Sequence, residues 1–119
     1  MADPPPRLAR LLEDVPPEIV ELVERCRLAI LEAMPDASER TYLGWRGLGF
    51  HHPVLGYVCA VFLREDHVAI GFEHGHLLDD PDGMLTGTGR RVRYLPVTEW
   101  THEIAEALDG FLAQTLADR

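Results

Sequence analysis

The sequence predicts an α+β fold: an antiparallel sheet of about four to five strands, with N- and C-terminal helices packed on one of its faces. Near both ends of the 119-residue chain, apolar residues recur every three or four positions, as in helices with one buried side. Between these segments, apolar residues alternate over short stretches, as in strands. Because no helical crossover separates the predicted strands, we expect neighbouring strands to pair antiparallel.

The first 15 residues are predicted to be an arm, flexible or partly helical, that precedes a single domain over residues 16–119. The arm starts with a proline run, and Leu8, Leu11 and Leu12 are spaced for a short helical turn. Residues 1–6 have neither a basic start nor an apolar stretch, so we expect no signal peptide. The chain also lacks an apolar run long enough to predict a membrane-spanning helix.

The first long helix is predicted over residues 18–33. Pro17 precedes it, and the fixed backbone angle of proline suits a first helical turn. Glu18 favours the same position because its charge complements the positive end of the helix dipole. Pro35 ends the helix, since the residue before a proline is disfavoured in helical geometry.

Three strands are predicted next. Residues 42–50 are interpreted as one strand with an irregular backbone around residues 48–51 that ends at Pro53. Residues 57–63 are apolar on both faces and predict a central strand. Residues 68–72 alternate again after a short polar break, which predicts a hairpin with the preceding strand.

The C-terminal third is predicted to contain a long glycine-rich loop over residues 73–90, a last strand over 91–95 closed by Pro96, and a second helix. Thr98 is the expected cap of this helix. The side chains expected on its inner face are Ile104, Leu108, Phe111, Leu112 and Thr115.

Composition excludes several functions. The chain contains no Lys, so it has neither a Schiff-base lysine nor the lysine of a phosphate-binding loop. The formal net charge is −9, and the excess acids lie in the two predicted helical ends. Such faces repel nucleic acids and anionic membrane surfaces, so we expect neither as a partner. Cys26 and Cys59 lie far apart in apolar stretches, which predicts two buried free thiols and a cytoplasmic protein.

No arrangement of catalytic residues is specified by the sequence. Ser38 is the only serine, and the Gly-x-Ser-x-Gly motif of a nucleophilic serine does not surround it. Enzymatic activity is therefore left open, with a binding function favoured.

The densest group of potential metal ligands lies in the predicted loop. Imidazole and carboxylate groups together suit a divalent metal such as iron, zinc, manganese or nickel. The alternative is a solvated loop whose aspartates stabilise turns. His51 and His52 lie on opposite strand faces, so at most one of them is expected in any one pocket. The candidate metal ligands are Glu73, His74, His76, Asp79, Asp80 and Asp82.

The segment 83–93 is the only basic stretch and is the candidate site for a small anionic ligand. Glycines let backbone amides converge on an anion, and guanidinium groups bind phosphate or carboxylate in a two-pronged manner. The alternative is that Arg91 and Arg93, on one strand face, pair with the acidic helices. The candidate ligand-binding residues are Gly87, Thr88, Gly89, Arg90, Arg91 and Arg93.

The second face of the sheet is a further candidate surface. Two helices cover only one face, so the face that carries Tyr42 and Trp45 is expected to be polar, covered by the N-terminal arm, or in contact with another chain. A protein partner or a homodimer through this open face is the corresponding expectation.

Three segments of the chain match motifs of a known family: Pro17-Glu18, the helix end Ala33-Met34-Pro35-Asp36-Ala37, and GHLLDDPDGMLTGTGRRVR over residues 75–93. With these segments the chain resembles the YdhG-like domain family, a bacterial family largely of unknown function, over about residues 15–115. The resemblance implies a frataxin-like fold, in which a two-helix layer covers an antiparallel sheet. One relative is described as a frataxin-like intracellular iron chaperone, which implies a role in iron handling.

The iron-linked acidic ridge of frataxins is not matched position by position. Arg25 and Arg27 interrupt the acidic residues of the first helix, so no frataxin site residue is carried over. The first expectation is a small binding protein that handles iron through the candidate metal ligands between Glu73 and Asp82. Glu18, Glu21 and Glu32 are expected to form a second, weaker metal-binding surface. The alternative is a module that binds a small anionic ligand or a protein partner through the 83–93 segment and the open sheet face.

Overall fold

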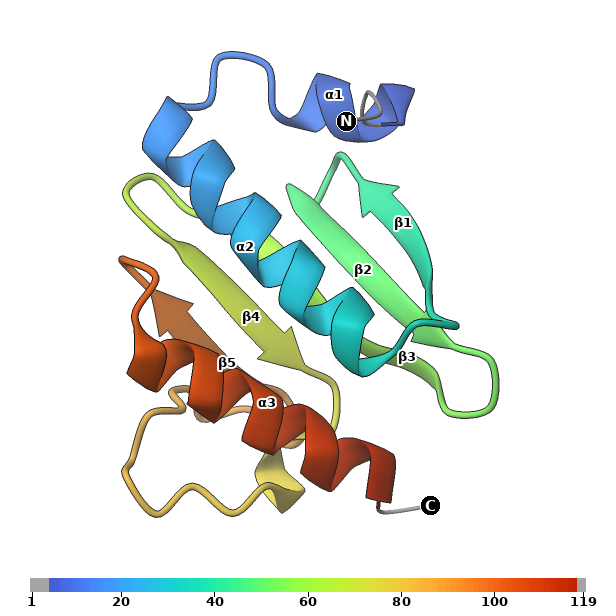
Figure 1. Cartoon of the computed structure of the whole chain (residues 1–119), viewed down its shortest axis with the longest axis vertical. Helices are drawn as coiled ribbons and strands as arrows, with labels where there is room; N and C mark the ends of the chain where they lie inside the picture. Colours follow the sequence, from blue (N-terminus) through green and yellow to red (C-terminus); the bar gives the residue numbers. More distant parts are fainter. Residues whose placement is uncertain (1–4, 118–119) are drawn as a thin grey trace.

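The computed structural model describes residues 5–117 and confirms the predicted α+β class. Five strands form one antiparallel sheet in the order β1-β2-β3-β4-β5, and α2 and α3 lie side by side on one face of it (Figure 1). Residues 1–4 of the predicted arm and residues 118–119 lie outside the described part. The elements are α1 (Pro6–Leu11), α2 (Pro17–Ala33), β1 (Ser38–Tyr42), β2 (Gly47–His52), β3 (Gly56–Leu63), β4 (Val68–Phe72), the 3-10 helix η1 (Gly75–Leu77), β5 (Arg93–Val97) and α3 (His102–Ala117).

The core lies between the sheet and the two long helices. Strand pairing aligns Leu48, Val61 and Ile70, and then Leu95, in one row across four strands. All four side chains are buried. The helices complete the core with fully buried residues that include Val23, Cys26, Ile30, Leu108 and Leu112. None of the helices in residues 5–117 has the length and apolar character that crossing a membrane requires.

The predicted helical turn near the N-terminus is present as α1. It lies beside β1, at the end of the sheet that α2 leaves uncovered (Figure 1). Leu8 and Leu11 are 1% and 5% exposed and belong to the same core cluster as the central strands. Residues 6–11 therefore pack as part of the domain.

The predicted single strand over 42–50 is wrong, because these residues form parts of two strands. The chain turns between Tyr42 and Gly47, where the Arg46 amide donates to the Leu43 carbonyl at 3.2 Å and Arg46 has a φ of 52°. Strand β1 was missed because an edge strand with one solvated face shows little apolar alternation. The predicted irregularity is real: the register with β3 shifts between Phe50 and His51.

The boundaries of the last two elements also differ from the prediction. Strand β5 continues through Pro96 to Val97. It is an edge strand, where a missing amide hydrogen is tolerated. The helix cap is Thr101 and not Thr98, since the Thr101 hydroxyl accepts the Ile104 amide at 3.1 Å. The predicted inner face of α3 is confirmed by buried Leu108, Phe111 and Leu112.

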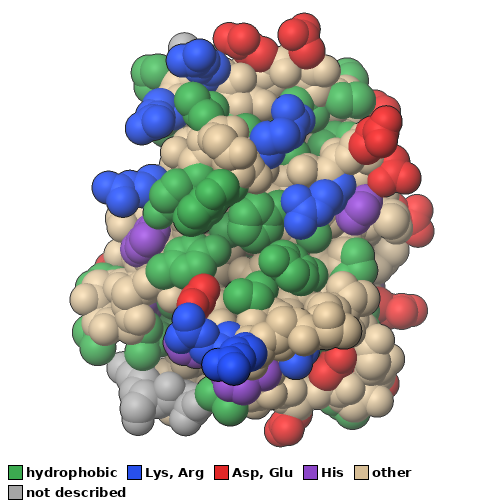
Figure 2. All heavy atoms as spheres, turned by 180° about the vertical axis from the view of Figure 1, so that it is seen from behind, with side chains coloured by type: hydrophobic (Ala, Val, Ile, Leu, Met, Phe, Trp, Pro, Cys, Tyr) green, Lys and Arg blue, Asp and Glu red, His purple; other side chains and the backbone are tan. Residues whose placement is uncertain are grey.

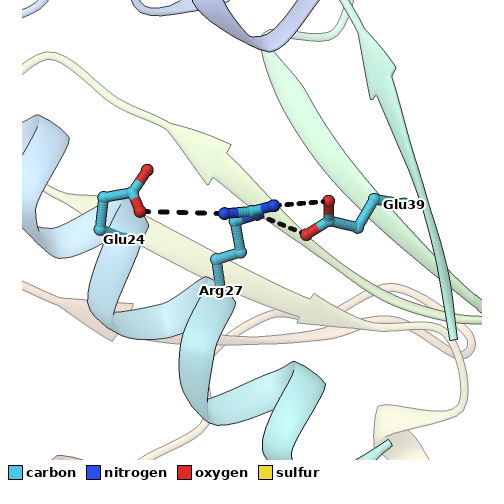
Figure 3. Close-up of polar contacts among 3 residues, drawn as sticks. All are labelled: Glu24, Arg27 and Glu39. Atoms are coloured by element: carbon cyan, nitrogen blue, oxygen red, sulfur yellow. Dashed lines mark hydrogen bonds and ion pairs between the residues drawn. The ribbon is translucent and has the colours of Figure 1, made fainter. Parts of the chain in front are cut away.

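An ion pair attaches α2 to the edge strand β1 (Figure 3). The Arg27 guanidinium donates from Nε and Nη2 to both carboxylate oxygens of Glu39, the second bond being 3.0 Å long. Glu24 lies 3.9 Å from the same guanidinium. The hydrogen bond to Glu39 raises the pKa of Arg27. This part of the acidic helix is thus engaged in holding the fold.

The two cysteines are buried and unpaired, as predicted. Burial raises the pKa of the Cys26 thiol from its ordinary value of 9.0 to about 12. Burial also raises the pKa of the Cys59 thiol, and Cys26 adds to the effect. Both thiols therefore stay protonated in the folded chain under conditions in which an unfolded chain would ionise them.

The raised thiol pKa values predict a loss of stability in alkali. The thiols' contribution is complete below the unfolded pKa and decreases as the pH rises towards the folded pKa, because only the unfolded chain then releases the protons. Between about pH 8 and about pH 10.5, each thiol is expected to lower the free energy of unfolding by about 2 kcal/mol. Urea unfolding at both pH values measures this loss. The Cys26→Ala/Cys59→Ala variant should lose correspondingly less, and an equal loss in both proteins would contradict the prediction.

Candidate functional site

On the open face of the sheet, opposite α2 and α3, aromatic side chains lie flat over glycine residues of the strands. A Cβ atom added to Gly49 would lie 2.8 Å from the Tyr42 ring. One added to Gly71 would lie 2.9 Å from the Phe62 ring and 3.0 Å from the Tyr94 ring. Glycine inside a strand leaves room for such close approach. The small residues thus allow the aromatic side chains to lie down on the sheet.

One row of rings begins at the β1–β2 turn. Trp45, which is 65% exposed, stacks on Tyr42 with ring centroids 4.9 Å apart. The Tyr42 hydroxyl makes a 3.0 Å hydrogen bond to Nε2 of His51. The His51 ring lies 5.4 Å from that of Tyr57. These contacts hold an accessible indole at the rim of the open face.

A second row lies over β3, β4 and β5. The rings of Phe62 and Tyr94 meet edge to face at 6.1 Å. Arg64 extends over both, with its Cζ atom 5.4 Å from the Phe62 centroid and 6.0 Å from that of Tyr94. A guanidinium over an aromatic face is held by attraction to the ring quadrupole. Its position is therefore fixed without a carboxylate.

The open face carries positive charge, although the chain as a whole is acidic. Within residues 5–117, neither Arg40 nor Arg64 pairs with a carboxylate, whereas Arg25, Arg27 and Arg91 each do. Figure 2 shows this side of the molecule: Arg side chains surround a central apolar area, and acidic side chains lie mainly along the outline. Charge is thus divided between the two sides of the sheet.

The predicted metal ligands are not brought together. Residues 75–77 form a 3-10 turn and not a strand, and the rings of His74 and His76 lie 6.3 Å apart. Glu73 pairs with Arg91 at 3.5 Å. The Asp80 carboxylate accepts the amides of residues 84 and 85, each at 2.9 Å. Asp79 and Asp82 are exposed in the same loop. In the described part of the chain, no three His, Cys, Asp or Glu side chains form a group that could hold a metal ion.

The other histidines and acids of the prediction have separate roles. His52 Nδ1 accepts the amides of Val54 and Leu55 at 3.1 and 3.2 Å, which stabilises the β2–β3 turn. Glu18, Glu21 and Glu32 are exposed on α2, and Glu21 lies 3.7 Å from Arg25.

The basic segment is used largely to hold its own loop. Arg93 Nη1 donates to the carbonyls of Gly89 and Val92 at 2.6 and 2.9 Å. Thr86 pairs with Tyr94 through two backbone hydrogen bonds of 2.8 Å. Arg91 pairs with Glu73 at the end of β4, so the expectation that it pairs with the acidic helices is wrong. Gly87 has a φ of 120°, which favours glycine. Gly87, Thr88, Gly89 and Arg90 are exposed.

Sequence reasoning missed the two free arginines of the open face. Arg40 lies on the strand that was not predicted, and Arg64 lies in a polar break between strands. A usable signal was present in Gly47 and Gly49, which alternate with the apolar residues Leu48 and Phe50. Two glycines on one strand face mark a sheet face with room for rings. No family model matches the chain, and neither does any curated protein or solved structure.

Proposed function

We propose that the protein is a binding module that docks an acidic segment of a protein partner on the open sheet face. The observation that carries this proposal is that Arg40 and Arg64 lie on the sheet face that carries the rings, Arg64 over two of them, and that neither has a carboxylate partner among the described residues. A free guanidinium binds a carboxylate with two parallel hydrogen bonds. Exposed Trp45 supplies an apolar anchor of the kind that dominates binding energy at interfaces.

The spacing of the arginines favours an extended chain over a small anion. The register places Arg40 opposite Gly49 and Gly49 opposite Ala60. Arg64 follows four positions after Ala60, directly after the end of β3. With strands about 4.8 Å apart and about 3.3 Å per residue, the two Cα atoms are roughly 16 Å apart. A small anion contacts one of them, whereas about five residues of extended peptide reach both.

Charge argues against two other occupants. A symmetric dimer through this face would bring Arg40 and Arg64 of both copies into one interface, where like charges oppose each other. A nucleic acid would meet the field of a chain with a net charge of −9, which opposes long-range attraction of a polyanion. A short acidic peptide segment carries fewer charges than a nucleic acid and binds through contacts at close range. The net negative charge of the chain therefore opposes its binding far less.

Fluorescence anisotropy with a labelled peptide of alternating Glu and Tyr tests this proposal. The chain is expected to bind the peptide saturably, and a peptide with Gln in place of Glu should bind much more weakly. The Arg40→Ala/Arg64→Ala variant should weaken binding at least about tenfold, a loss of about 1.4 kcal/mol. Arg25→Ala on the helical side is the matched control and should leave the affinity unchanged.

Three results would overturn the proposal. One is equal affinity of the wild type and the double variant. Another is tighter binding of an oligothymidylate of the same charge, which would assign the face to nucleic acid. A third is a dimer in sedimentation analysis that Trp45→Ala dissociates and that does not bind the peptide, which would assign the face to a second copy.

Two further assignments from the sequence stand as proposals. Membership of the YdhG-like family, with its implied iron handling, is supported by the quoted motifs. The acids available to a weakly bound metal are the exposed ones of α2, Glu18, Glu21 and Glu32. A cytoplasmic location is supported by the two free, buried thiols.

A further inference from the structure

Of the two edge strands of the sheet, β5 is covered and β1 is open. Tyr94 of β5 exchanges two backbone hydrogen bonds of 2.8 Å with Thr86, and Pro96 has no amide hydrogen to offer. Strand β1 pairs with β2, and its outward backbone groups make no hydrogen bond to another residue within 5–117. Helix α1 lies near the arrowhead of β1 and leaves the outer side of the strand open (Figure 1). Unpaired groups at a sheet edge are a template for a further strand.

Two hollows meet at the open edge of β1. The first has a volume of about 370 Å³ and the second a volume of about 280 Å³. The first extends along Tyr42 and Trp45, which belong to the open face, and the second lies beside Leu8 and Leu48, which belong to the core on the helical side. Successive side chains of a strand point to opposite faces, so a strand added to β1 would place its side chains alternately in the two hollows. The residues that line both hollows are Arg7, Arg40 and Thr41.

The charge at this edge is positive and free. Neither Arg7 nor Arg40 pairs with a carboxylate in the described part of the chain. Among the described residues, Glu39 is the one acid that lines either hollow, and both of its carboxylate oxygens accept hydrogen bonds from Arg27. An acidic side chain placed opposite Arg40 in an added strand forms a stabilising cross-strand pair. The edge therefore favours an acidic segment over a basic one.

A second copy of the chain suits this edge less well. Two β1 strands related by a two-fold axis pair antiparallel, with the same residues meeting at the axis. The register that pairs the whole of Ser38–Tyr42 centres on Arg40 and sets the two guanidinium groups opposite each other. Like charges directly opposite each other destabilise a strand pair.

We infer that an acidic segment of the partner adds to β1 as a sixth strand of the five-stranded sheet. Its backbone pairs with the outward groups of residues 38–42, which supplies affinity through main-chain hydrogen bonds. Its acidic side chains lie on the open-face side near Arg40, and its apolar side chains enter the hollow beside Leu8. This inference rests on the proposed function, because it assigns how the same partner is held where it passes Arg40.

Fluorescence anisotropy with two backbone-methylated forms of the alternating Glu and Tyr peptide tests this inference. One form carries an N-methyl group on every Tyr and the other on every Glu, so both keep all side chains of the parent peptide. In an edge strand, the amides of alternate residues point to the neighbouring strand. We therefore expect one form to bind at least about tenfold more weakly than the parent peptide and the other form to bind as the parent does.

The outcomes separate this inference from the docking on the open face. Equal affinity of the two methylated forms would overturn the edge pairing, and if Arg64→Ala still weakens binding, docking on the face stands. Loss with one methylated form and no effect of Arg64→Ala would overturn the open-face proposal alone. No binding of the parent peptide would overturn both. A dimer of the free chain whose amides at residues 38–42 are protected from hydrogen exchange would assign the edge to a second copy.

Arg7→Ala tests the same edge from the side of the protein. It should weaken binding of the parent peptide at least about threefold, because Arg7 lines both hollows. Arg10→Ala is the matched control, since Arg10 is exposed on the same helix and lines neither hollow, and it should leave the affinity unchanged. Equal affinities of the two variants would contradict the assignment of the partner to this edge.

Discussion

Replacing Leu8 with alanine is expected to lower the free energy of unfolding by about 2–5 kcal/mol. Leu8 is only 1% exposed and belongs to the cluster that the central strands form. The truncation removes buried methyl groups and leaves a cavity next to β1. For a domain of this size, we expect the midpoint of thermal unfolding to decrease by roughly 10 °C.

Leu28→Ala is the matched control for this prediction, because Leu28 is 59% exposed on α2 and its truncation should change stability by less than about 0.5 kcal/mol. Calorimetry of the two variants compares the same chemical change at a buried and an exposed site. Equal melting temperatures for both variants would show that residues 6–11 do not contribute to the core.

Replacing Gly75 with alanine is expected to destabilise the protein by about 1–3 kcal/mol, as overpacking of a closed site does. The added Cβ atom would lie 2.6 Å from both the backbone nitrogen and the Cβ atom of Arg93. Backbone atoms of a paired strand cannot rotate away, so η1 must separate from β5. Amide hydrogen exchange should become faster over residues 73–90, and urea unfolding gives the loss of stability.

The same loop provides the control for Gly75→Ala. Gly89 has open space where a Cβ atom would be placed, so Gly89→Ala should leave stability and exchange nearly unchanged. If both variants exchange and unfold alike, the close packing of η1 on β5 is not what orders this loop.

Sequence reasoning predicted well the elements in which apolar residues recur at a regular spacing. Helix α2 has an apolar stripe, a proline start and a proline after its end, and β3 and β4 are apolar on the face that the helices cover. Strand β1 was missed because Ser38, Glu39 and Arg40 give no alternating signal at a sheet edge. Pro96 was expected to close a strand, yet an edge strand accommodates it.

The candidate site was harder to predict than the fold for a physical reason. The many His, Asp and Glu residues between Glu73 and Asp82 suggested a metal site. In the structure a 3-10 turn separates the two histidines, and the Asp80 carboxylate stabilises the loop. The open-face surface depends instead on pairing between strands. Arg40 and Arg64 share one sheet face only because three strands align in a register that local sequence does not specify.

Amide chemical-shift mapping by NMR, with the alternating Glu and Tyr peptide added to the wild-type chain, tests whether the open sheet face is the docking surface. We expect the shifts to concentrate on the open face, at Arg40, Trp45, Arg64 and Tyr94, while the outer surface of α2 around Arg25 stays unchanged. Shifts confined to α2 and α3, or no shifts at saturating peptide, would contradict the assignment of the open sheet face as the docking surface.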